Sequence, residues 1–302
     1  MKKGFKRIIC GIAAMSMVAA FGLAGCAGGN SSSSASSSSS AQTEATDAIS
    51  LQVFAANSLA KAMPEAMEAY TALHPEVTFA DAQYLASDDL NAQLEGGAPC
   101  DIEITASKAT MDTAVEKNLV DEATRVDMFG NDLVIIAKTD SEIAKNADAT
   151  PVTLKDIADK KYTVSIGDEN VPAGNYARQS LSTVGAFKAT GEDAGKTGSE
   201  ISGKEGEYVG IDPMLAAKVG DVAQYVSAGD VETGFVYSSD VYRFDGVTTV
   251  GIVEDDTHKA IVYPGAVTAN AEHPEEAQAF LSWCLEDPEA QAIWNKWGFE
   301  LI

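Results

Sequence analysis

Small, uncharged and hydroxyl-bearing residues stand where a predicted strand passes directly into a helix. The stretch "VFAANSLAKAM", residues 53–63, begins with a β-prone pair and turns helical from Leu59. Asn57 and Ser58, which lie between the two, are good N-cap residues. The first N–H groups of a helix lack intrahelical acceptors, so such a junction can donate hydrogen bonds to an anion. The residue types at 55–58 therefore indicate that a ligand approaches the backbone closely.

Four more junctions have the same character. Ser87 follows the stretch "QYLA", Ala173 follows "VSIGDENVP", and Tyr237 ends the strand "GFVY". Val219 opens a helical turn just before "VAQYVSAGD". Taken alone, each serine is more simply an N-cap. Together, several helix starts of one α/β protein could meet at one cleft and supply hydroxyl and N–H donors without positive charge.

No set of residues in the sequence is typical of an enzyme. The three histidines, His74, His258 and His273, belong to no metal or nucleophile motif. Cys100 and Cys284 lie far apart and form no Cys-x-x-Cys or Cys/His cluster, which argues against a structural zinc site. Each of these cysteines is either a buried apolar thiol or, in an extracellular setting, a partner in a disulfide.

The segments that must position these residues alternate between strand and helix. Such alternation predicts an α/β fold with parallel sheets, in which ligands bind at the carboxyl ends of the strands. Residues 188–210 contain six glycines and no apolar period, so we expect a surface insertion or a mobile loop there. Proline stands at the first position of two expected C-terminal helices, at 274 and 288. The expected strands are 51–55, 77–79, 102–105, 133–137, 162–166 and 234–237, and the other expected helices are 58–73, 87–95, 108–117, 154–158, 173–184 and 213–226.

The N-terminal residues have the pattern of a secreted, lipid-anchored protein. Four basic residues precede an apolar stretch at 8–23, and Ala-Gly separates its last residue, Leu23, from Cys26. This pattern predicts a lipoprotein signal peptide at residues 1–25, lipidation of Cys26 and a Ser-rich tether at 26–49. The alternative is an ordinary signal peptide with an incidental cysteine. Lipidation would place the protein outside the cytoplasm, anchored to the cell membrane.

The net charge limits the partners of the chain. The formal charge is −24, and removal of the signal peptide with its four basic residues makes it −28. Such a surface argues against nucleic acid and against anionic lipid headgroups as partners. It does not argue against a small anion, because neutral donors in a local pocket can bind one.

Over about residues 51–302 the sequence resembles the substrate-binding proteins of molybdate ABC importers. The resemblance rests on stretches that occur in the family's order along nearly the whole domain, which is more specific than any single motif. These stretches are "VFAANSLAKAM", "QLEGGAPCDIEITASKATMD", "LVDEATRVDMFGNDLVIIAK", "IGDENVPAGNYARQSL", "GFVYSSD", "EDDTHKAIVYPGAV" and "PEAQAIWNKWGF".

This resemblance implies a two-lobed α/β fold of the type II periplasmic-binding-protein kind, with the ligand cleft between the lobes. Lobe one would comprise residues 50–130 and 240–302, and lobe two residues 131–239. The ligand would be molybdate or tungstate, with molybdenum held only as the oxyanion, no cofactor and no enzymatic activity. A monomer would deliver the ligand to an ABC permease and its ATPase. The residues implied to bind the oxyanion are Ser58, Ser87, Ala173, Val219 and Tyr237.

Two departures from the family pattern bear on the ligand. The second serine is followed by Asp88 and Asp89, which disfavour an anion unless they point to solvent. Turned inward, they would favour a protonated oxyanion instead. Gly220 stands where family members usually carry a basic residue after the valine.

Three other functions fit parts of the sequence. The same fold could bind sulfate or phosphate, which competition between anions at fixed pH would distinguish. A lipid-anchored serine hydrolase is a second interpretation, although no base lies near a candidate serine in the sequence. A third is an adhesion or scaffolding lipoprotein with a degenerate pocket, which no anion would stabilise.

Overall fold

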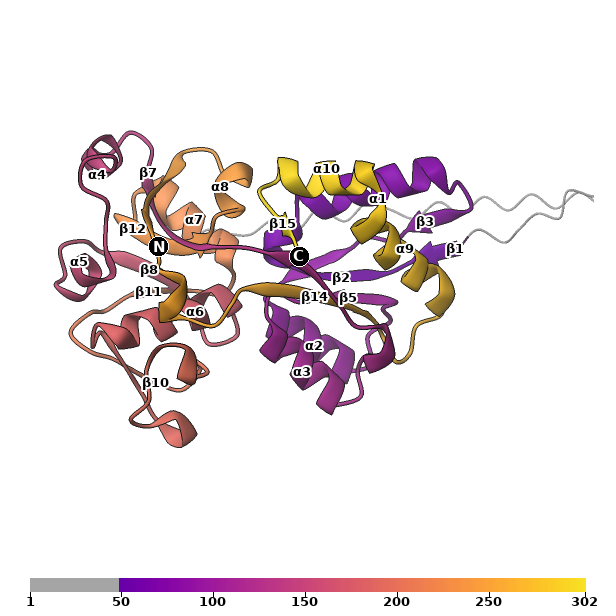
Figure 1. Cartoon of the computed structure of the whole chain (residues 1–302), viewed down its shortest axis with the longest axis horizontal. Coiled ribbons are helices and arrows are strands. Elements are labelled where there is room, and N and C mark those ends of the chain that lie inside the picture. Colours follow the sequence, from indigo (N-terminus) through magenta and orange to yellow (C-terminus); the bar gives the residue numbers. More distant parts are fainter. Residues whose placement is uncertain (1–48) are drawn as a thin grey trace, which may run out of the picture. The chain divides into compact units, whose positions relative to one another are not determined.

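The computed structural model describes residues 49–302 (Figure 1). The expected signal peptide (1–25), the lipidation site Cys26 and the Ser-rich tether lie outside the described residues, apart from the last tether residue, Ile49. Ile49 starts strand β1 (Ile49–Leu51), which pairs in parallel with β3 (Val77–Phe79). Within 49–302, no helix combines the length and the apolarity that a membrane crossing requires.

A six-stranded sheet forms the core of one lobe, called lobe one here. Its strands lie in the order β15-β6-β14-β5-β2-β4. β2 pairs in parallel with β4 and β5, whereas β14 pairs antiparallel with β5 and β6. The strands are β2 (Val53–Ala56), β4 (Gln83–Leu85), β5 (Ile102–Ile104), β6 (Val126–Gly130), β14 (Val262–Val267) and β15 (Glu300–Leu301).

Helices cover both faces of this sheet because its central strands are apolar on both sides. In β2, Val53 and Ala55 belong to the main core, while Phe54 packs in a second cluster with Leu90. Figure 1 shows α2 and α3 on one face and α1, α9 and α10 on the other. Both C-terminal helices begin at proline, as predicted. The helices are α1 (Ala62–Leu73), α2 (Ser87–Glu95), α3 (Lys108–Glu116), α9 (Pro274–Glu286) and α10 (Pro288–Lys296).

A five-stranded sheet in the order β11-β8-β12-β7-β13 forms the core of lobe two. β8 pairs in parallel with β11 and β12, whereas β7 pairs antiparallel with β12 and β13. Both sheets are therefore mixed, and the expectation of parallel sheets is wrong. The chain enters lobe two through β7 and returns to lobe one through β14, and each of these two strands is antiparallel to both of its neighbours. The strands are β7 (Leu133–Lys138), β8 (Val164–Gly167), β11 (Met214–Ala216), β12 (Thr233–Tyr237) and β13 (Val247–Ile252).

The start of α7 differs from the expected helix at 213–226. Residues 214–216 form β11, an edge strand beside β8, and the helix begins at Val219. Pairing with β8 decides the conformation of this short segment, and its own sequence pattern does not. The helices of lobe two are α4 (Glu142–Asn146), α5 (Leu154–Ala158), α6 (Pro172–Thr183), α7 (Val219–Ala228) and α8 (Asp240–Arg243).

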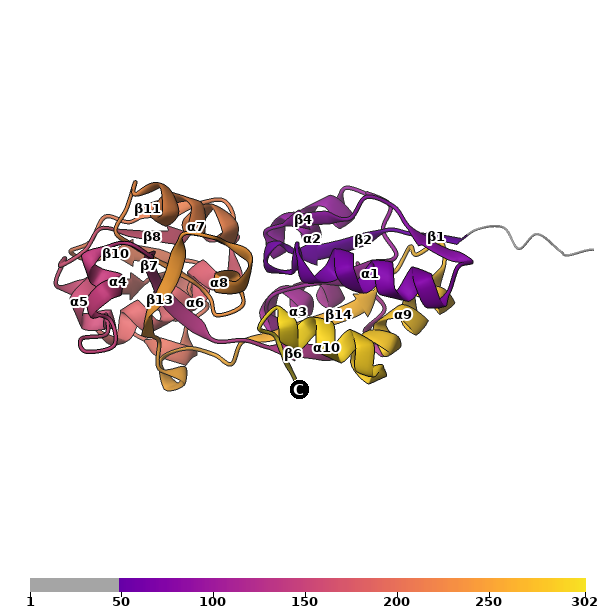
Figure 2. The same cartoon turned by 90° about the horizontal axis from the view of Figure 1, so that it is seen from above.

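The chain passes between the two sheets twice, at 131–132 and at 253–261 (Figure 2). The first passage lies where the lobe boundary is expected from the sequence. The second boundary needs correction, because the expected division at 239–240 assigns β13 to lobe one. β13 pairs with β7 in the sheet of lobe two. Its sequence, "VTTVGI", is rich in β-branched residues, which favour strands. The strand covers an edge of β7 that would otherwise be open.

Residues 188–210 hold more structure than the expected loop. β9 (Phe187–Ala189) and β10 (Gly206–Tyr208) pair antiparallel, and two 3-10 turns, η3 (Gly191–Asp193) and η4 (Gly198–Glu200), lie between them. Arg178 of α6, which is 3% exposed, donates from Nε to the carbonyl of Gly203. A buried side chain of lobe two therefore holds this segment in place.

The two cysteines of the described chain are buried thiols without a disulfide. Burial raises the pKa of both Cys100 and Cys284 above the ordinary thiol value. No group of three or more His, Cys, Asp or Glu side chains within 49–302 is arranged to hold a metal ion.

Candidate functional site

One small cavity, lined from both lobes, collects the strand-to-helix junctions singled out in the sequence. The 3-10 turn η1 (Asn57–Leu59) and helices α2, α6 and α7 each begin at its wall. All five residues predicted to bind an oxyanion line it. Its volume is about 10 Å³, close to the space of one water molecule. The lining residues are Ala56, Asn57, Ser58, Leu85, Ala86, Ser87, Ala106, Val171, Pro172, Ala173, Val219 and Tyr237.

Neither predicted serine caps the helix at which it stands. The N-cap residues of η1 and α2 are Ala56 and Ala86, and neither makes a side-chain capping hydrogen bond. The N-cap interpretation is therefore wrong for Ser58 and Ser87. Both hydroxyls are buried at the cavity, where they can bond to other groups.

Ser58 reaches the cavity from the end of β2. Its Oγ lies 2.9 Å from Oη of Tyr263, a residue of β14. Nδ2 of Asn131, at the first passage between the sheets, donates to the same Tyr263 oxygen at 3.4 Å. Either hydroxyl can donate in this contact, and Tyr263 can give its own proton to Ser58 Oγ while it accepts from Asn131. The Ser58 proton is then available to the cavity.

Ser87 is held at the cavity by the peptide that follows β5. Its Oγ accepts from the backbone N of Ala106 at 3.0 Å. Tyr237 Oη donates to the carbonyl of the same Ala106 at 3.4 Å, which is a long hydrogen bond. One peptide of lobe one thus fixes a serine of its own lobe and a tyrosine of lobe two. Because Ser87 Oγ uses a lone pair here, its O–H remains free to donate.

Ala173 presents its backbone N–H from the first turn of α6. Pro172 occupies the first helical position, so the N–H of Ala173 has no intrahelical acceptor. The helix approaches β8 closely because Gly174 has no side chain. A Cβ at this position would lie 2.0 Å from the carbonyl oxygen of Gly167. The Val-Pro-Ala-Gly sequence therefore seats the helix start against the end of β8.

Val219 brings the start of α7 to the cavity, and Asn57 joins this helix to lobe one. The N–H of Gly220 donates to Asn57 Oδ1 at 3.2 Å, and Arg243 Nη2 donates to the same oxygen at 3.1 Å. Asn57 Nδ2 in turn donates to the carbonyl of Tyr84 at 3.1 Å. A Cβ at position 220 would stand 2.9 Å from Asn57 Oδ1. This contact gives a steric reason for glycine at the position.

The cavity wall is electrically neutral. None of its twelve lining residues, all in the described part of the chain, has a charged side chain. Burial raises the pKa of Tyr237 well above its ordinary value, so the phenol keeps the proton that it directs at the Ala106 carbonyl. Burial also raises the pKa of Tyr263, which contacts Ser58. The wall therefore offers hydroxyl and N–H donors without formal charge.

The two aspartates after Ser87 lie outside the cavity wall. Asp88 Oδ1 accepts from Thr110 Oγ1 at 2.9 Å, and Oδ2 pairs with Nζ of Lys204 from lobe two. Asp89 is exposed at its surface, and partial burial together with the Asp88 carboxylate raises its pKa. Neither carboxylate is in place to accept a hydrogen bond from a protonated ligand in the cavity.

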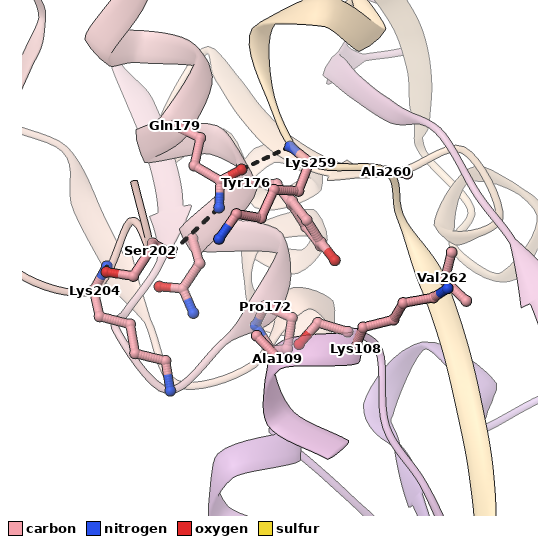
Figure 3. Close-up of a pocket in the computed structure, with 12 residues that line it drawn as sticks. Lys108, Ala109, Pro172, Tyr176, Gln179, Ser202, Lys204, Lys259, Ala260 and Val262 are labelled. Carbon is pink, nitrogen blue, oxygen red and sulfur yellow. Dashed lines mark hydrogen bonds between the residues drawn. The ribbon is translucent and has the colours of Figure 1, made fainter. Parts of the chain in front are cut away.

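A larger cavity of about 260 Å³, shown in Figure 3, shares Pro172 with the small one. Several polar groups at its wall have partners in the protein. Gln179, for example, accepts from the backbone N of Lys259 at 2.8 Å and donates to the carbonyl of Ser202 at 3.3 Å. Three lysines stand around this cavity: Lys108, Lys204 and Lys259.

Three contributors to the site are missed from the sequence. Tyr263 positions Ser58, the Ala106 peptide positions Ser87, and Asn57 bridges the lobes. Tyr263 lies in the quoted stretch "EDDTHKAIVYPGAV", so a signal for it was present. The other two roles depend on contacts between segments far apart in the chain.

Comparison with known proteins places the chain in a family. Residues 51–300 match the family described as bacterial extracellular solute-binding protein. The molybdate-binding protein ModA of Escherichia coli (strain K12) is 30% identical over 84% of this chain and 90% of its own length. YvgL of Bacillus subtilis (strain 168), named as a candidate ABC transporter substrate-binding lipoprotein, is 26% identical over 85% of this chain and 88% of its own.

A solved structure agrees with this placement. The substrate-binding domain of a candidate molybdenum ABC transporter from Clostridium difficile has a TM-score of 0.58 at 28% identity. The match covers 84% of this chain and 99% of that domain. The predicted two-lobed α/β fold of type II binding proteins is thereby confirmed. The chain belongs to the bacterial extracellular solute-binding protein family and is a non-enzymatic substrate-binding protein of an ABC transporter.

Proposed function

We propose that this protein binds molybdate or tungstate in the small cavity and delivers it to an ABC permease. The observation that carries this proposal is the meeting of five residues at one neutral cavity. They are Ser58, Ser87, Ala173, Val219 and Tyr237. The 30% identical relative ModA of Escherichia coli is named for molybdate binding, which supports the choice of ligand.

The wall suits a doubly charged anion that carries no proton. Hydrogen bonds to a charged group contribute about 1.5–3 kcal/mol each, so a few donors can offset the loss of the anion's hydration. The starts of α2, α6 and α7 add the positive ends of their helix dipoles. No lysine or arginine is needed at the wall for such binding.

Selection among oxyanions follows from size and protonation. The metal–oxygen bonds of molybdate and tungstate are longer than the sulfur–oxygen bonds of sulfate. A cavity wall that fits the larger anions therefore contacts sulfate poorly. Phosphate carries a proton near neutral pH and needs an acceptor for it. No lining residue is a carboxylate, and both aspartates near Ser87 lie outside the wall. An unpaired buried donor costs about 1–3 kcal/mol, which disfavours phosphate.

Binding requires movement of the lobes. The cavity has the volume of about one water, and a tetrahedral oxyanion is larger, so the wall must open slightly to admit it. Ser58 and Ser87 belong to lobe one, whereas Ala173 and Val219 belong to lobe two. An anion that bonds to both sets favours the closed lobes, and the permease would recognise that closed form.

We further propose that Cys26 carries a lipid and that the Ser-rich residues after it form a tether. The leader pattern before Cys26 and the word lipoprotein in the name of the relative YvgL support this anchor. The tether would hold a monomer close to the membrane while it docks on the permease and its ATPase.

Thermal unfolding of residues 27–302 with each anion tests the ligand. Molybdate or tungstate at a hundred times its dissociation constant should add about 2.7 kcal/mol of stability, because it binds only the folded protein. Sulfate and phosphate at the same concentration should add little. Ser58→Ala should reduce the molybdate shift, whereas the matched control Ser227→Ala, on the far end of α7, should leave it unchanged.

The other outcomes separate the alternatives. Stabilisation by sulfate or phosphate in place of molybdate would assign a different oxyanion to the same fold. No shift with any of the four anions would contradict an oxyanion site and favour a protein with a degenerate pocket.

A further inference from the structure

One ion pair joins the two lobes directly beside the small cavity. Asp88 follows Ser87 in the first turn of α2, and its Oδ2 pairs with Nζ of Lys204. The two residues are 116 positions apart, and Lys204 comes from the glycine-rich segment of lobe two. The side chains are 18% and 38% exposed, so the pair is only partly screened by water.

The structure builds Lys204 into this position. The preceding residue, Gly203, has φ +74°, and a Cβ there would lie 2.2 Å from the carbonyl oxygen of Asn175. The Gly203 carbonyl accepts from Nε of Arg178, which is buried in α6. The backbone at 203 is thus packed against the same helix that presents Ala173 to the cavity. The ammonium group therefore extends toward lobe one from a fixed base.

Asp88 needs such a partner if the cavity holds a dianion. Asp88 directly follows Ser87, which lines the cavity, so its negative charge would repel a dianion bound there. The chain as a whole is strongly acidic, which adds to the repulsion. Lys108, another lysine near α2, pairs with Asp127 at 2.6 Å and is engaged elsewhere.

We propose that Lys204 sets the affinity for the oxyanion by neutralising Asp88 across the closed cleft, an inference that rests on the proposed function. Because the two charges belong to different lobes, separation of the lobes also separates the pair. Closure then removes the repulsive charge beside the cavity at the same moment as the donors of both lobes meet. Lys204 thus acts on the affinity through Asp88 and does not touch the ligand.

A set of charge variants of residues 27–302 tests this role by titration with sodium molybdate in a calorimeter. Lys204→Met leaves Asp88 unpaired and should weaken binding about tenfold at low salt. Asp88→Asn in the same chain removes the repulsion, so the double variant should return to within about threefold of the wild type. Lys204→Arg keeps the charge and should bind like the wild type.

The control pair is Lys117 and Glu95, which are 2.6 Å apart and join α3 to α2 within lobe one. Lys117→Met breaks an ion pair of the same type away from the cavity and should leave molybdate affinity unchanged. The weakening in Lys204→Met should also shrink at high ionic strength, because salt screens the Asp88 charge.

Three results would overturn the role of Lys204. If the wild type binds molybdate and Lys204→Met binds it equally well, the neutralising role of Lys204 is contradicted and the proposed function is not. A double variant as weak as Lys204→Met would show that Lys204 acts through the shape of its segment and not through Asp88. A wild type that binds none of the four anions would overturn the proposed function, and the neutralising role with it.

Discussion

Lobe one and lobe two meet the same cavity with different chemistry. Lobe one brings two serine hydroxyls, Ser58 and Ser87, whereas lobe two brings the backbone at Ala173 and Val219 and the phenol of Tyr237. A single substitution removes a hydroxyl, but a backbone N–H remains under every substitution except proline. The hydroxyls of Ser58, Ser87 and Tyr237 are therefore open to direct deletion, whereas the backbone donors of lobe two are changed by moving their helix.

The lobes also differ in two buried ionisable groups, Arg178 and Glu103. Arg178 in lobe two is 3% exposed and donates to several backbone and side-chain oxygens. Glu103 in lobe one is fully buried, and neither carboxyl oxygen has a hydrogen-bond partner among the described residues. Burial, with a smaller effect of Asp88, raises the pKa of Glu103 to about 8. Lobe two thus holds a permanent charge in a complete network, and lobe one a group that is neutral at pH 7.

The largest expected effect is the loss of Arg178. Arg178→Met keeps the side-chain volume but leaves the carbonyls of Gly167 and Asp168, both now 2.8 Å from a guanidinium nitrogen, without their donors. We expect the free energy of unfolding to fall by about 4 kcal/mol in urea denaturation, since at least two buried carbonyls lose a charged donor at about 1–3 kcal/mol each. Arg125→Met is the control, because Arg125 is partly exposed with one ion pair, to Asp112. A loss no larger than in that control would contradict the contrast between the lobes.

Moving α6 should have the next largest effect. In Gly174→Ala the new Cβ must displace the Gly167 carbonyl, so α6 shifts away from β8 and carries the Ala173 N–H with it. We expect the free energy of unfolding to fall by about 3 kcal/mol, at the upper end for overpacking. Molybdate affinity, measured by calorimetry, should fall together with stability.

Gly96→Ala is the matched control for this shift. A Cβ at Gly96, which follows α2, would lie 3.3 Å from its nearest neighbour, so the position needs only slight adjustment. Normal molybdate binding by a folded Gly174→Ala protein would show that the start of α6 contributes no donor to the ligand.

Deletion of a lobe-one hydroxyl should have a smaller effect. Ser87→Ala removes one donor from the cavity and leaves the buried N–H of Ala106 without its acceptor. We expect a loss of about 2 kcal/mol in stability, because a buried donor is left unpaired, and a molybdate affinity at least tenfold weaker. The two effects can be separated by comparison with Ser227→Ala, which removes an exposed helix hydroxyl. Lost stability with unchanged affinity would assign Ser87 a structural role only.

The sequence sufficed for the fold class and for the five residues that meet at the cavity. Strand-to-helix order and the family resemblance both place Ser58 and Ala173 at carboxyl ends of strands, where a cleft forms. Strand direction was not predictable in this way. A strand that enters a lobe from the other side, such as β14, has the same apolar pattern as a parallel one.

Contacts between distant segments were also out of reach. β13 belongs to lobe two because β7 offers it an edge, and nothing within residues 247–252 records that partner. The glycine-rich segment looked irregular because its order comes from Arg178, whose bonding partners lie elsewhere in the chain. Asp88 looks unfavourable for anion binding from the sequence for the same reason, because its partner Lys204 lies 116 positions away along the chain.

The smallest expected effect concerns Glu103 and depends on pH. Its folded pKa of about 8 lies above the ordinary value of 4.5, so the folded protein keeps a proton that the unfolded chain has released. The stabilising contribution of this proton is fully present below pH 4.5 and is lost as pH rises toward 8. Between these values the contribution falls by about 1.4 kcal/mol per pH unit. Glu103→Gln has no such proton to lose and should remove this pH dependence.

Urea denaturation at pH 5.5 and pH 6.5 measures this difference between the lobes. The stability of Glu103→Gln relative to the wild type should rise by about 1.3 kcal/mol between the two pH values. Glu95→Gln, at an exposed carboxylate paired with Lys117, should show no such rise. An equal difference at both pH values for Glu103→Gln would mean that the carboxyl is already ionised in the folded state. Lobe one would then hold a buried charge as lobe two does, and the contrast between the lobes would rest on their donors alone.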